Sequence, residues 1–373
     1  MSLTHLHIVT HDVPYPASIG GLVDIYHKII WLHKKDIKIH LHCYAKNIKP
    51  QKELEKYCET VHYYKRKKIH FPYFNLPYIV GSRTDENLLQ NLQKDNHPIL
   101  FEGIHSTFLL QQNKFTNRKT FVRLFNTEHI YYKQLQLHEQ NFFKKIYFAI
   151  EAVLLKKYEQ SIANKTQFIA LSQSDVAFYK DLYNANKISF IPVFLPYDFV
   201  QSKIGKGSYC MYHGNLSVSE NEYAATYLLE NIFSKINYPL IIAGKNPSGS
   251  LQKIASKYKN ISIVQSPSET NMQLLIQNAH INILPSFNAT GVKLKLLNAL
   301  YNGRFCIAND AGIAGSGLQE LCGIANNDDA FVKNINELLQ ATFTEKEMQH
   351  RSTALKVLYN NNTNTDNLLK LLQ

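Results

Sequence analysis

Apolar and polar residues follow two different periods in the first half of the chain. Short apolar runs typical of buried strands lie at residues 5–10, 37–45, 98–103, 119–129 and 166–172. Between the first two runs, residues 21–35 repeat apolar positions at helical spacing. This alternation predicts βαβ units and a parallel sheet. A further long helix is predicted within residues 142–163 from the spacing of Phe143, Ile146, Tyr147, Ile150, Val153 and Leu154.

The pattern breaks near residues 192–207, where two prolines and two glycines predict a linker. A second series follows, with strands at 208–214, 239–244, 261–266, 281–286 and 304–310 and helices at 220–236, 271–279 and 293–302. We therefore expect two doubly wound, Rossmann-like α/β domains facing each other across a cleft, over residues 1–195 and 205–350. The tail reads as two helices separated by the polar run 360–366, and the last helix, about 355–373, is expected to join the first domain.

Composition narrows the class of protein. The 373 residues suit two domains, and no apolar run is long enough for a membrane-spanning helix. The first residues form a strand pattern rather than a signal peptide. Five scattered cysteines without a CxxC motif favour a reduced, cytoplasmic compartment.

The positive charge is concentrated in the first half. Residues 1–195 hold 26 Lys and Arg against 16 Asp and Glu, which is +10 of the net charge of +12. A basic domain favours an anionic partner such as lipid headgroups, a phosphorylated acceptor or nucleic acid, although a solubilising lysine surface has the same composition. Residues 62–78 combine four consecutive basic residues with six aromatics, which favours an anionic membrane surface. Stacking on nucleic-acid bases and a plain solvated loop are the alternative interpretations of this segment. Of these possible partners we do not expect nucleic acid.

Several glycines stand where a strand passes into a helix. Gly20 and Gly21 do so in the first domain, although they do not form the GxGxxG motif of dinucleotide sites. Gly214 repeats this arrangement in the second domain, and Lys245 places a cation after another strand. An ordinary glycine turn and a surface lysine are the simpler interpretations.

The most specific segment is residues 288–305, NATGVKLKLLNALYNGRF. It predicts a helix whose start exposes the backbone N–H groups of residues 289–292 beside Lys293, an arrangement that suits an anion. Neither a DxD motif nor a His, Cys, Asp and Glu cluster with metal-ligand spacing occurs in the sequence, so we expect no catalytic metal and no cofactor. The alternating histidines at 5, 7, 40 and 42 are interpreted as strand residues.

These motifs together resemble the family-four (group 1) glycosyltransferases of the GT-B fold, and the branch that builds bacterial surface polysaccharides in particular. The resemblance rests on Gly20-Gly21, RLFNTEHIYY, YHGNLSVSEN and the segment from Gly291 to Leu318. It implies retaining, metal-independent transfer of a sugar, with mannose as one candidate, from a nucleotide-diphosphate sugar to a glycan or polyprenyl-phosphate-linked acceptor. The enzyme would be cytoplasmic or peripheral at the inner membrane face.

The resemblance also implies roles for individual residues. The donor would be bound by Gly214, Asn215, Lys245, Thr290, Gly291, Val292, Lys293, Leu294 and Asn298, and Lys293 would assist departure of the diphosphate. Thr290 and Asn298 stand where relatives have two glutamates eight positions apart. Because Asn298 lacks a charge-assisted bond to the ribose, we expect donor binding to be weaker by about 1–2 kcal/mol.

In the first domain, His105 matches the histidine that relatives direct at the reacting sugar. The expected phosphate loop and acceptor residues are Gly20, Gly21, Arg123, Asn126, Glu128 and His129; the last two could instead only cap the following helix. A non-catalytic scaffold or sugar-binding subunit is the alternative function, and a nucleotide-sugar epimerase would need a carboxylate acid/base that the sequence does not supply clearly.

Overall fold

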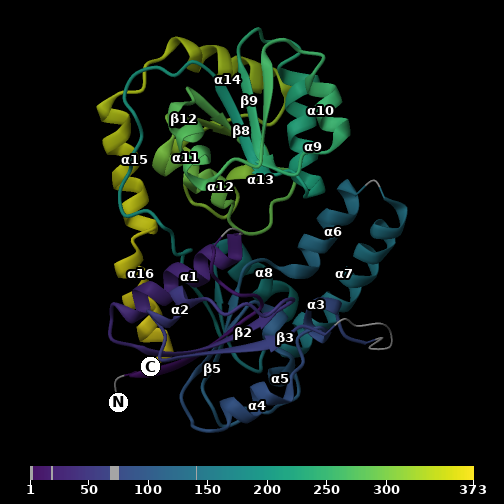
Figure 1. The fold of residues 1–373 in the computed structure, drawn as a ribbon, viewed down its shortest axis with the longest axis vertical. Helices are drawn as coiled ribbons and strands as arrows, with labels where there is room; N and C mark the ends of the chain where they lie inside the picture. The colour runs from purple at the N-terminus through teal and green to yellow at the C-terminus, as the bar shows by residue number, and fades with distance from the viewer. Residues whose placement is uncertain (1–2, 18–19, 68–74, 140) are drawn as a thin grey trace. The chain divides into compact units, whose positions relative to one another are not determined.

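A computed structural model describes residues 3–17, 20–67, 75–139 and 141–373. Contacts between residues divide the chain into two compact units. The first consists of residues 1–133, 147–196 and 359–373, and the second consists of residues 134–146 and 197–358. Each unit is a parallel sheet with helices around it, as the sequence predicts (Figure 1).

The first unit contains a seven-stranded parallel sheet in the order β3-β2-β1-β4-β5-β6-β7. The strands are β1 His5–Thr10, β2 Lys38–Ala45, β3 Thr60–Lys65, β4 Ile99–Glu102, β5 Thr120–Leu124, β6 Gln167–Ala170 and β7 Ile188–Phe190. Since the chain order reverses between β1 and β4, the loops after these two strands flank a topological switch point, where doubly wound folds bind ligands.

Nine α-helices and one 3₁₀ turn accompany this sheet in the described part of the chain. They are α1 Gly20–His33, α2 Lys52–Glu55, α3 Tyr78–Gly81, α4 Glu86–Leu92, η1 Ile104–Ser106, α5 Phe108–Gln111, α6 Glu128–His138, α7 Phe142–Ile162, α8 Gln173–Tyr183 and α16 Asn361–Leu372. The ends of α6 and α7 that face each other along the chain, residues 134–146, belong to the second unit by contacts.

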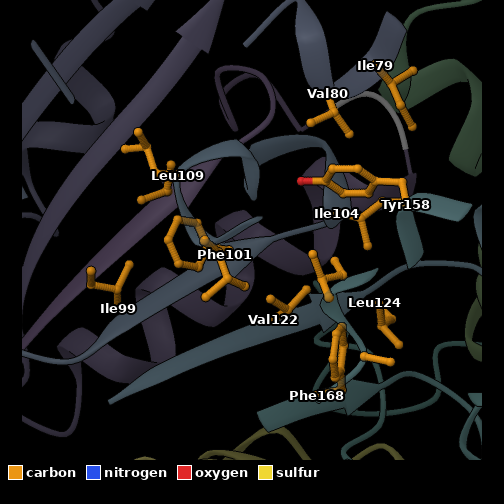
Figure 2. Close-up of a cluster of buried hydrophobic side chains, with 14 of the residues drawn as sticks. Ile79, Val80, Ile99, Phe101, Ile104, Leu109, Val122, Leu124, Tyr158 and Phe168 are labelled. Atoms are coloured by element: carbon orange, nitrogen blue, oxygen red, sulfur yellow. The ribbon is translucent and has the colours of Figure 1, made fainter. Parts of the chain in front are cut away.

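Figure 2 shows one apolar core of the first unit, in which Phe101 of β4, Val122 of β5 and Phe168 of β6 lie near Tyr158 of α7. All of these side chains are buried, and each fully buried apolar side chain contributes about 1.5–3 kcal/mol. The Tyr158 hydroxyl is 2.9 Å from the Thr107 hydroxyl, so its polar end is satisfied inside the core.

A second core of this unit is ionic. Lys28 of α1 donates to Asp24 at 2.9 Å and lies 2.8 Å from Glu102 of β4. Arg123 of β5 donates to both carboxylate oxygens of Asp24, at 3.0 and 3.1 Å. All four side chains are buried. Burial acts to raise the pKa of Asp24, but the Arg123 and Lys28 cations outweigh it and hold that pKa below its usual range.

The second unit contains a six-stranded parallel sheet in the order β10-β9-β8-β11-β12-β13. Its strands are β8 Cys210–Asn215, β9 Leu240–Lys245, β10 Ile261–Gln265, β11 Ile281–Ile283, β12 Phe305–Ala308 and β13 Gly323–Ile324. Its helical segments are α9 Ser219–Tyr227, the π turn η2 Leu228–Ile232, α10 Gly249–Ala255, α11 Glu269–Asn278, α12 Leu294–Asn302, α13 Asp310–Ile313, η3 Gln319–Leu321, α14 Asp328–Gln340 and α15 Glu345–Leu358. Here the switch point lies between β8 and β11.

The polar run 360–366 does not separate two helices, as the sequence had suggested, but begins α16. The Asn360 side chain accepts a bond from Thr363 N–H and so caps the helix. Asn361 is buried, and its carboxamide donates to Leu195 C=O at 2.8 Å and accepts from Leu195 N–H at 3.1 Å. Capping and buried polar contacts thus convert an apparent break into a helix start.

Candidate active site

His11 and His105 meet at the switch point of the first sheet. His11 follows β1 and His105 lies in η1, directly after β4; their rings are 5.0 Å apart between centroids. The Nδ1 atoms of both are buried and have no hydrogen-bond partner among the described residues. Burial lowers the pKa of His105 well below its usual range and that of His11 to about 3, and Arg83 adds to both effects. Two neutral imidazoles with open nitrogens suit the hydroxyl groups of a sugar.

Glycines allow the backbone to approach these rings closely. A Cβ on Gly21 would lie 3.4 Å from Cε1 of His11, and one on Gly103 would lie 2.8 Å from Nδ1 of His105. Gly103 also has φ of 76°, a conformation that favours glycine. Gly20 and Gly21 begin α1, so the predicted glycine pair does lie beside the histidine pair.

Arg83 also belongs to this region, although sequence reasoning did not select it. It is buried and donates from Nε to His11 C=O at 2.8 Å. Its cation influences the pKa of His11, His105 and Glu128, which indicates that these groups surround it. It stands in a polar loop after α3, and no motif marks it.

The four residues predicted in and after β5 have different environments, with Arg123 inside the strand and the other three behind it. Glu128 is buried; burial and the nearby Glu159 carboxylate raise its pKa to about 8, against a hydrogen bond from Asn126. His129 Nδ1 lies 3.0 Å from Glu159 and 2.6 Å from the Tyr183 hydroxyl.

The Arg123 guanidinium is fully engaged by Asp24 and by the carbonyls of Ile191 and Pro192. Arg123 and His129 therefore serve the fold, and we leave them out of the proposed site.

At the switch point of the second sheet, the loop between β11 and α12 presents open amides. Asn288 Oδ1 accepts from Thr290 N–H at 2.8 Å and from the Thr290 hydroxyl at 2.7 Å. Gly291 follows with φ of 64°. Among the described residues, no acceptor is bonded to the N–H of Gly291 or Val292. Lys293 is the N-cap of α12, and its ammonium donates to Thr290 C=O at 2.6 Å. The predicted anion site thus keeps two amides, while the Thr290 amide and hydroxyl are used by the loop itself.

Lys295, in the first turn of α12, is a cation that sequence reasoning missed. Its Nζ donates to Asn221 Oδ1 at 3.0 Å and lies 4.9 Å from the centroid of the Tyr212 ring. Burial lowers its pKa to about 8, partly offset by Glu220. The Ser286 hydroxyl donates to Glu220 at 2.5 Å, which ties the same loop to α9. A lysine within a leucine-rich helix is usually interpreted as an exposed residue, so no sequence signal identifies this cluster.

Gly214 and Asn215 end β8, and Asn215 pairs with Lys245 at the end of β9. A Cβ on Gly244 would come within 1.9 Å of Gly214 C=O, so these strand ends require glycine. Asn215 Oδ1 accepts from the Ser217 hydroxyl at 2.7 Å, whereas the Lys245 side chain is exposed.

On α12, Asn298 Oδ1 accepts from Asn302 at 2.8 Å, and Leu294 is the first helical residue. The described part of the chain contains no group of three or more His, Cys, Asp or Glu able to hold a metal ion.

Residues 207–341, which lie within the second unit, match the family model described as glycosyl transferases group 1. The structure of a glycosyltransferase from Rickettsia africae superposes with a TM-score of 0.67 at 14% identity, over 100% of this chain and 98% of that one. The chain therefore has the GT-B fold of glycosyltransferases, as the resemblance implied.

Two further proteins that the chain resembles carry more specific descriptions. HepE from Anabaena, solved with UDP and glucose, has a TM-score of 0.66 at 9% identity and covers 98% of this chain and 99% of its own. An uncharacterized 44.6 kDa protein in the cps region of Klebsiella pneumoniae is 28% identical over 354 residues, which is 88% of this chain and 89% of the relative.

Proposed function

We propose that the chain transfers a sugar from a nucleotide-diphosphate sugar to a glycan or polyprenyl-phosphate-linked acceptor, with retention of configuration. The open amides of Gly291 and Val292 at the start of α12 carry this proposal. They lie within the residues that match the group 1 glycosyl transferase model, with Lys293 and Lys295 on the same segment. Helix-start amides and cations are the groups that bind a diphosphate.

The proposed mechanism follows from where charge develops. As the bond between sugar and phosphate breaks, its electron pair moves to the diphosphate, which the two amides and the Lys293 ammonium stabilise. In this proposal they supply the positive charge that a metal ion would otherwise provide, and no cofactor beyond the donor takes part. The acceptor hydroxyl attacks the sugar on the side of the leaving group and passes its proton to a departing phosphate oxygen. Retention then needs no side-chain nucleophile.

The remaining predicted residues have binding roles in this proposal. Gly214, Asn215, Lys245 and Asn298 belong to the donor side. His105, with His11 beside it, forms a hydrogen bond to a hydroxyl of the transferred sugar. Gly20 and Gly21 allow the start of α1 to lie close to these two histidines. Asn126 and Glu128 contribute to the acceptor side, where the raised pKa of Glu128 leaves a protonated carboxyl able to donate a hydrogen bond.

The cps-region relative supports a place in surface polysaccharide synthesis. We propose that the chain acts at the cytoplasmic face of a membrane. No helix in the described ranges combines the length and the apolar character needed to cross a bilayer. The membrane contact expected for residues 62–78 remains a hypothesis, and residues 68–74 of it lie outside the described residues. Within the described part, Arg66 is 3.8 Å from Asp12, and Lys65 and Lys67 are exposed.

The test begins with binding of uridine, guanosine and cytidine diphosphates by calorimetry, followed by transfer assays with the matching sugar donors, mannose included. We expect Lys293→Ala to keep the fold and to lose most turnover, whereas Lys259→Ala, which removes an exposed lysine of the same unit, behaves like wild type. Equal turnover of both variants would refute the role of Lys293.

A non-catalytic scaffold is the second candidate, because Thr290 and Asn298 replace both glutamates of the motif. Nucleotide binding without transfer to any acceptor and without donor hydrolysis would favour that function.

A further inference from the structure

Helix α7 presents an exposed apolar surface along its first three turns. The spacing of its apolar residues predicted the helix correctly, but those residues do not enter a core. Phe143 is 80% exposed, Ile150 55% and Val153 56%. Together with Phe142 and Ile146 they form what we call the α7 apolar face. At 100° per residue these five positions fall within about a third of the helix circumference.

The opposite side of α7 is already packed. Ala152 and Leu155 are buried there, and Figure 2 shows Tyr158 among the core side chains of β5 and β6. The two glutamates of α7 also point inward: Glu151 accepts from Tyr78 N–H at 2.9 Å, and Glu159 accepts from Glu128 N–H at 2.8 Å. The buried side of α7 therefore supplies its core packing, whereas the side chains of the α7 apolar face are 44–80% exposed.

The exposed charges of α7 all have one sign. Lys144, Lys145, Lys156 and Lys157 are exposed, whereas Glu151 and Glu159 are buried. On the helical wheel Lys145 and Lys156 lie along one edge of the apolar face. Lys157 lies on the same side of the helix as this face, one turn beyond Val153. Exposed phenylalanine and isoleucine bordered by lysine, with no exposed carboxylate on the helix, fit an apolar partner that carries negative charge.

We propose that α7 docks on the surface of an anionic lipid bilayer. The helix lies in the plane of the interface, with the α7 apolar face in the boundary between headgroups and acyl chains and its lysines on lipid phosphates. A second copy of this chain is a poorer partner, because pairing two such faces would bring together Lys145, Lys156 and Lys157 of both copies. This docking does not depend on the transferase activity.

The experiment is flotation of the full chain with vesicles of phosphatidylcholine alone or of an equal mixture with phosphatidylglycerol. We expect binding to the mixed vesicles only. The double variant Phe143→Ser/Ile150→Ser should bind about ten-fold less or weaker still, because it removes two inserted apolar side chains. The matched control is Phe199→Ser/Val357→Ser, which removes side chains 64% and 75% exposed elsewhere and should bind like wild type. Changing the four α7 lysines to Gln should abolish the preference for phosphatidylglycerol.

Three outcomes would overturn the proposal. The first is wild-type protein that does not float with either vesicle. The second is flotation that survives the α7 variants and is lost when Lys65, Arg66 and Lys67 are changed to Gln, which would assign the contact to residues 62–78. The third is a wild-type dimer in sedimentation velocity that Phe143→Ser/Ile150→Ser dissociates without any vesicle binding, which would identify a second copy as the partner.

Discussion

The Nδ1 atom of His7 lies 2.9 Å from the Nε2 atom of His42, so the two rings link β1 to β2 in the first sheet. His7 Nε2 is 3.0 Å from the Asp95 carboxylate, and His42 Nδ1 is 2.9 Å from the Tyr64 hydroxyl. One arrangement of protons gives every bond one donor: Tyr64 donates to His42, His42 to His7, and His7 to Asp95. Both histidines are neutral in this arrangement.

This chain of bonds predicts that acid destabilises the protein. Burial lowers the pKa of His7 to about 4, despite Asp95, and lowers that of His42 well below its usual range. The unfolded chain takes up protons below about pH 6.5, whereas the folded chain resists until about pH 4. Stability is therefore complete above pH 6.5 and falls between pH 6.5 and 4, by about 3 kcal/mol for His7 alone. Urea unfolding across this range measures the loss.

The matched variants are His7→Gln and His350→Gln. Glutamine at position 7 cannot be protonated, so this variant should show a smaller loss of stability between pH 6.5 and 4. His350 is exposed, and its variant should follow wild type. A wild-type free energy of unfolding that is constant down to pH 4 would contradict the assignment.

The ionic core predicts a large cost for losing one cation. Lys28→Met leaves Glu102 buried without its ammonium and removes one of the two cations on Asp24. Removing one partner of a buried pair costs about 3–5 kcal/mol. Lys34 is exposed and directly follows the same helix, and its ammonium lies 4.1 Å from the centroid of the Trp31 ring. Lys34→Met loses only this contact and should cost below about 1 kcal/mol. Equal unfolding midpoints for the two variants would show that the charge cluster is not stabilising.

The period of apolar residues predicted both parallel sheets, because most strands are short apolar runs between helical patterns. It did not predict β3, β7 and β13, which lie at the edges of the two sheets. It did not predict which side of α7 is buried. That helix has apolar residues on both sides, and its glutamates, normally a sign of exposure, are buried on backbone amides. The run at 360–366 was read as a break, because asparagine favours loops until a carboxamide such as that of Asn361 finds buried partners.

The candidate site also has parts that the sequence predicts and parts that it does not. The glycine pair and the amides at residues 291–292 were found because a strand followed by glycine and a helix start is a local pattern. Arg83 and Lys295 were missed because each is brought to its site by contacts distant in sequence, with His11 in one case and Asn221 in the other. Arg123 lies near the carboxyl end of β5 and His129 follows that strand. Their partners Asp24 and Glu159 lie elsewhere in the chain and hold them in the core.

The His105 ring predicts a variant impaired in transfer but not in nucleotide binding. His105→Asn removes the open imidazole nitrogen at the switch point of the first sheet and changes no residue of the second unit, which contains the proposed donor site. Loss of one hydrogen bond to the sugar should lower kcat by about 10-fold, while the calorimetric affinity for the nucleoside diphosphate stays the same. His33→Asn, at the exposed end of α1, is the control. An unchanged kcat would remove His105 from the site.

Lys295 predicts a pH dependence of donor binding. Its pKa is lowered to about 8 by burial, so its charge is complete near pH 7 and is lost as the pH rises through about 8. If this ammonium supports the diphosphate loop, affinity for the nucleotide should decrease between pH 7 and 9. Lys295→Arg keeps its charge over this range and should bind with constant affinity. The same decrease in both proteins would assign the titration to another group.

A substitution of Asn298 should increase the affinity for the nucleoside diphosphate above that of the natural chain. Its Oδ1 accepts from Asn302, and a glutamate at this position retains an acceptor for that bond while adding a charged oxygen for the donor ribose. Asn298→Glu should bind the nucleoside diphosphate about 10-fold more tightly, since hydrogen bonds to charged groups exceed neutral ones by about 1–2 kcal/mol. Asn278→Glu adds the same charge to an exposed position of the second unit and should leave affinity unchanged. The gain must also disappear with a 2′,3′-dideoxy nucleotide, which lacks the hydroxyls concerned. A gain that persists with this nucleotide, or no gain at all, would show that residue 298 does not face the ribose.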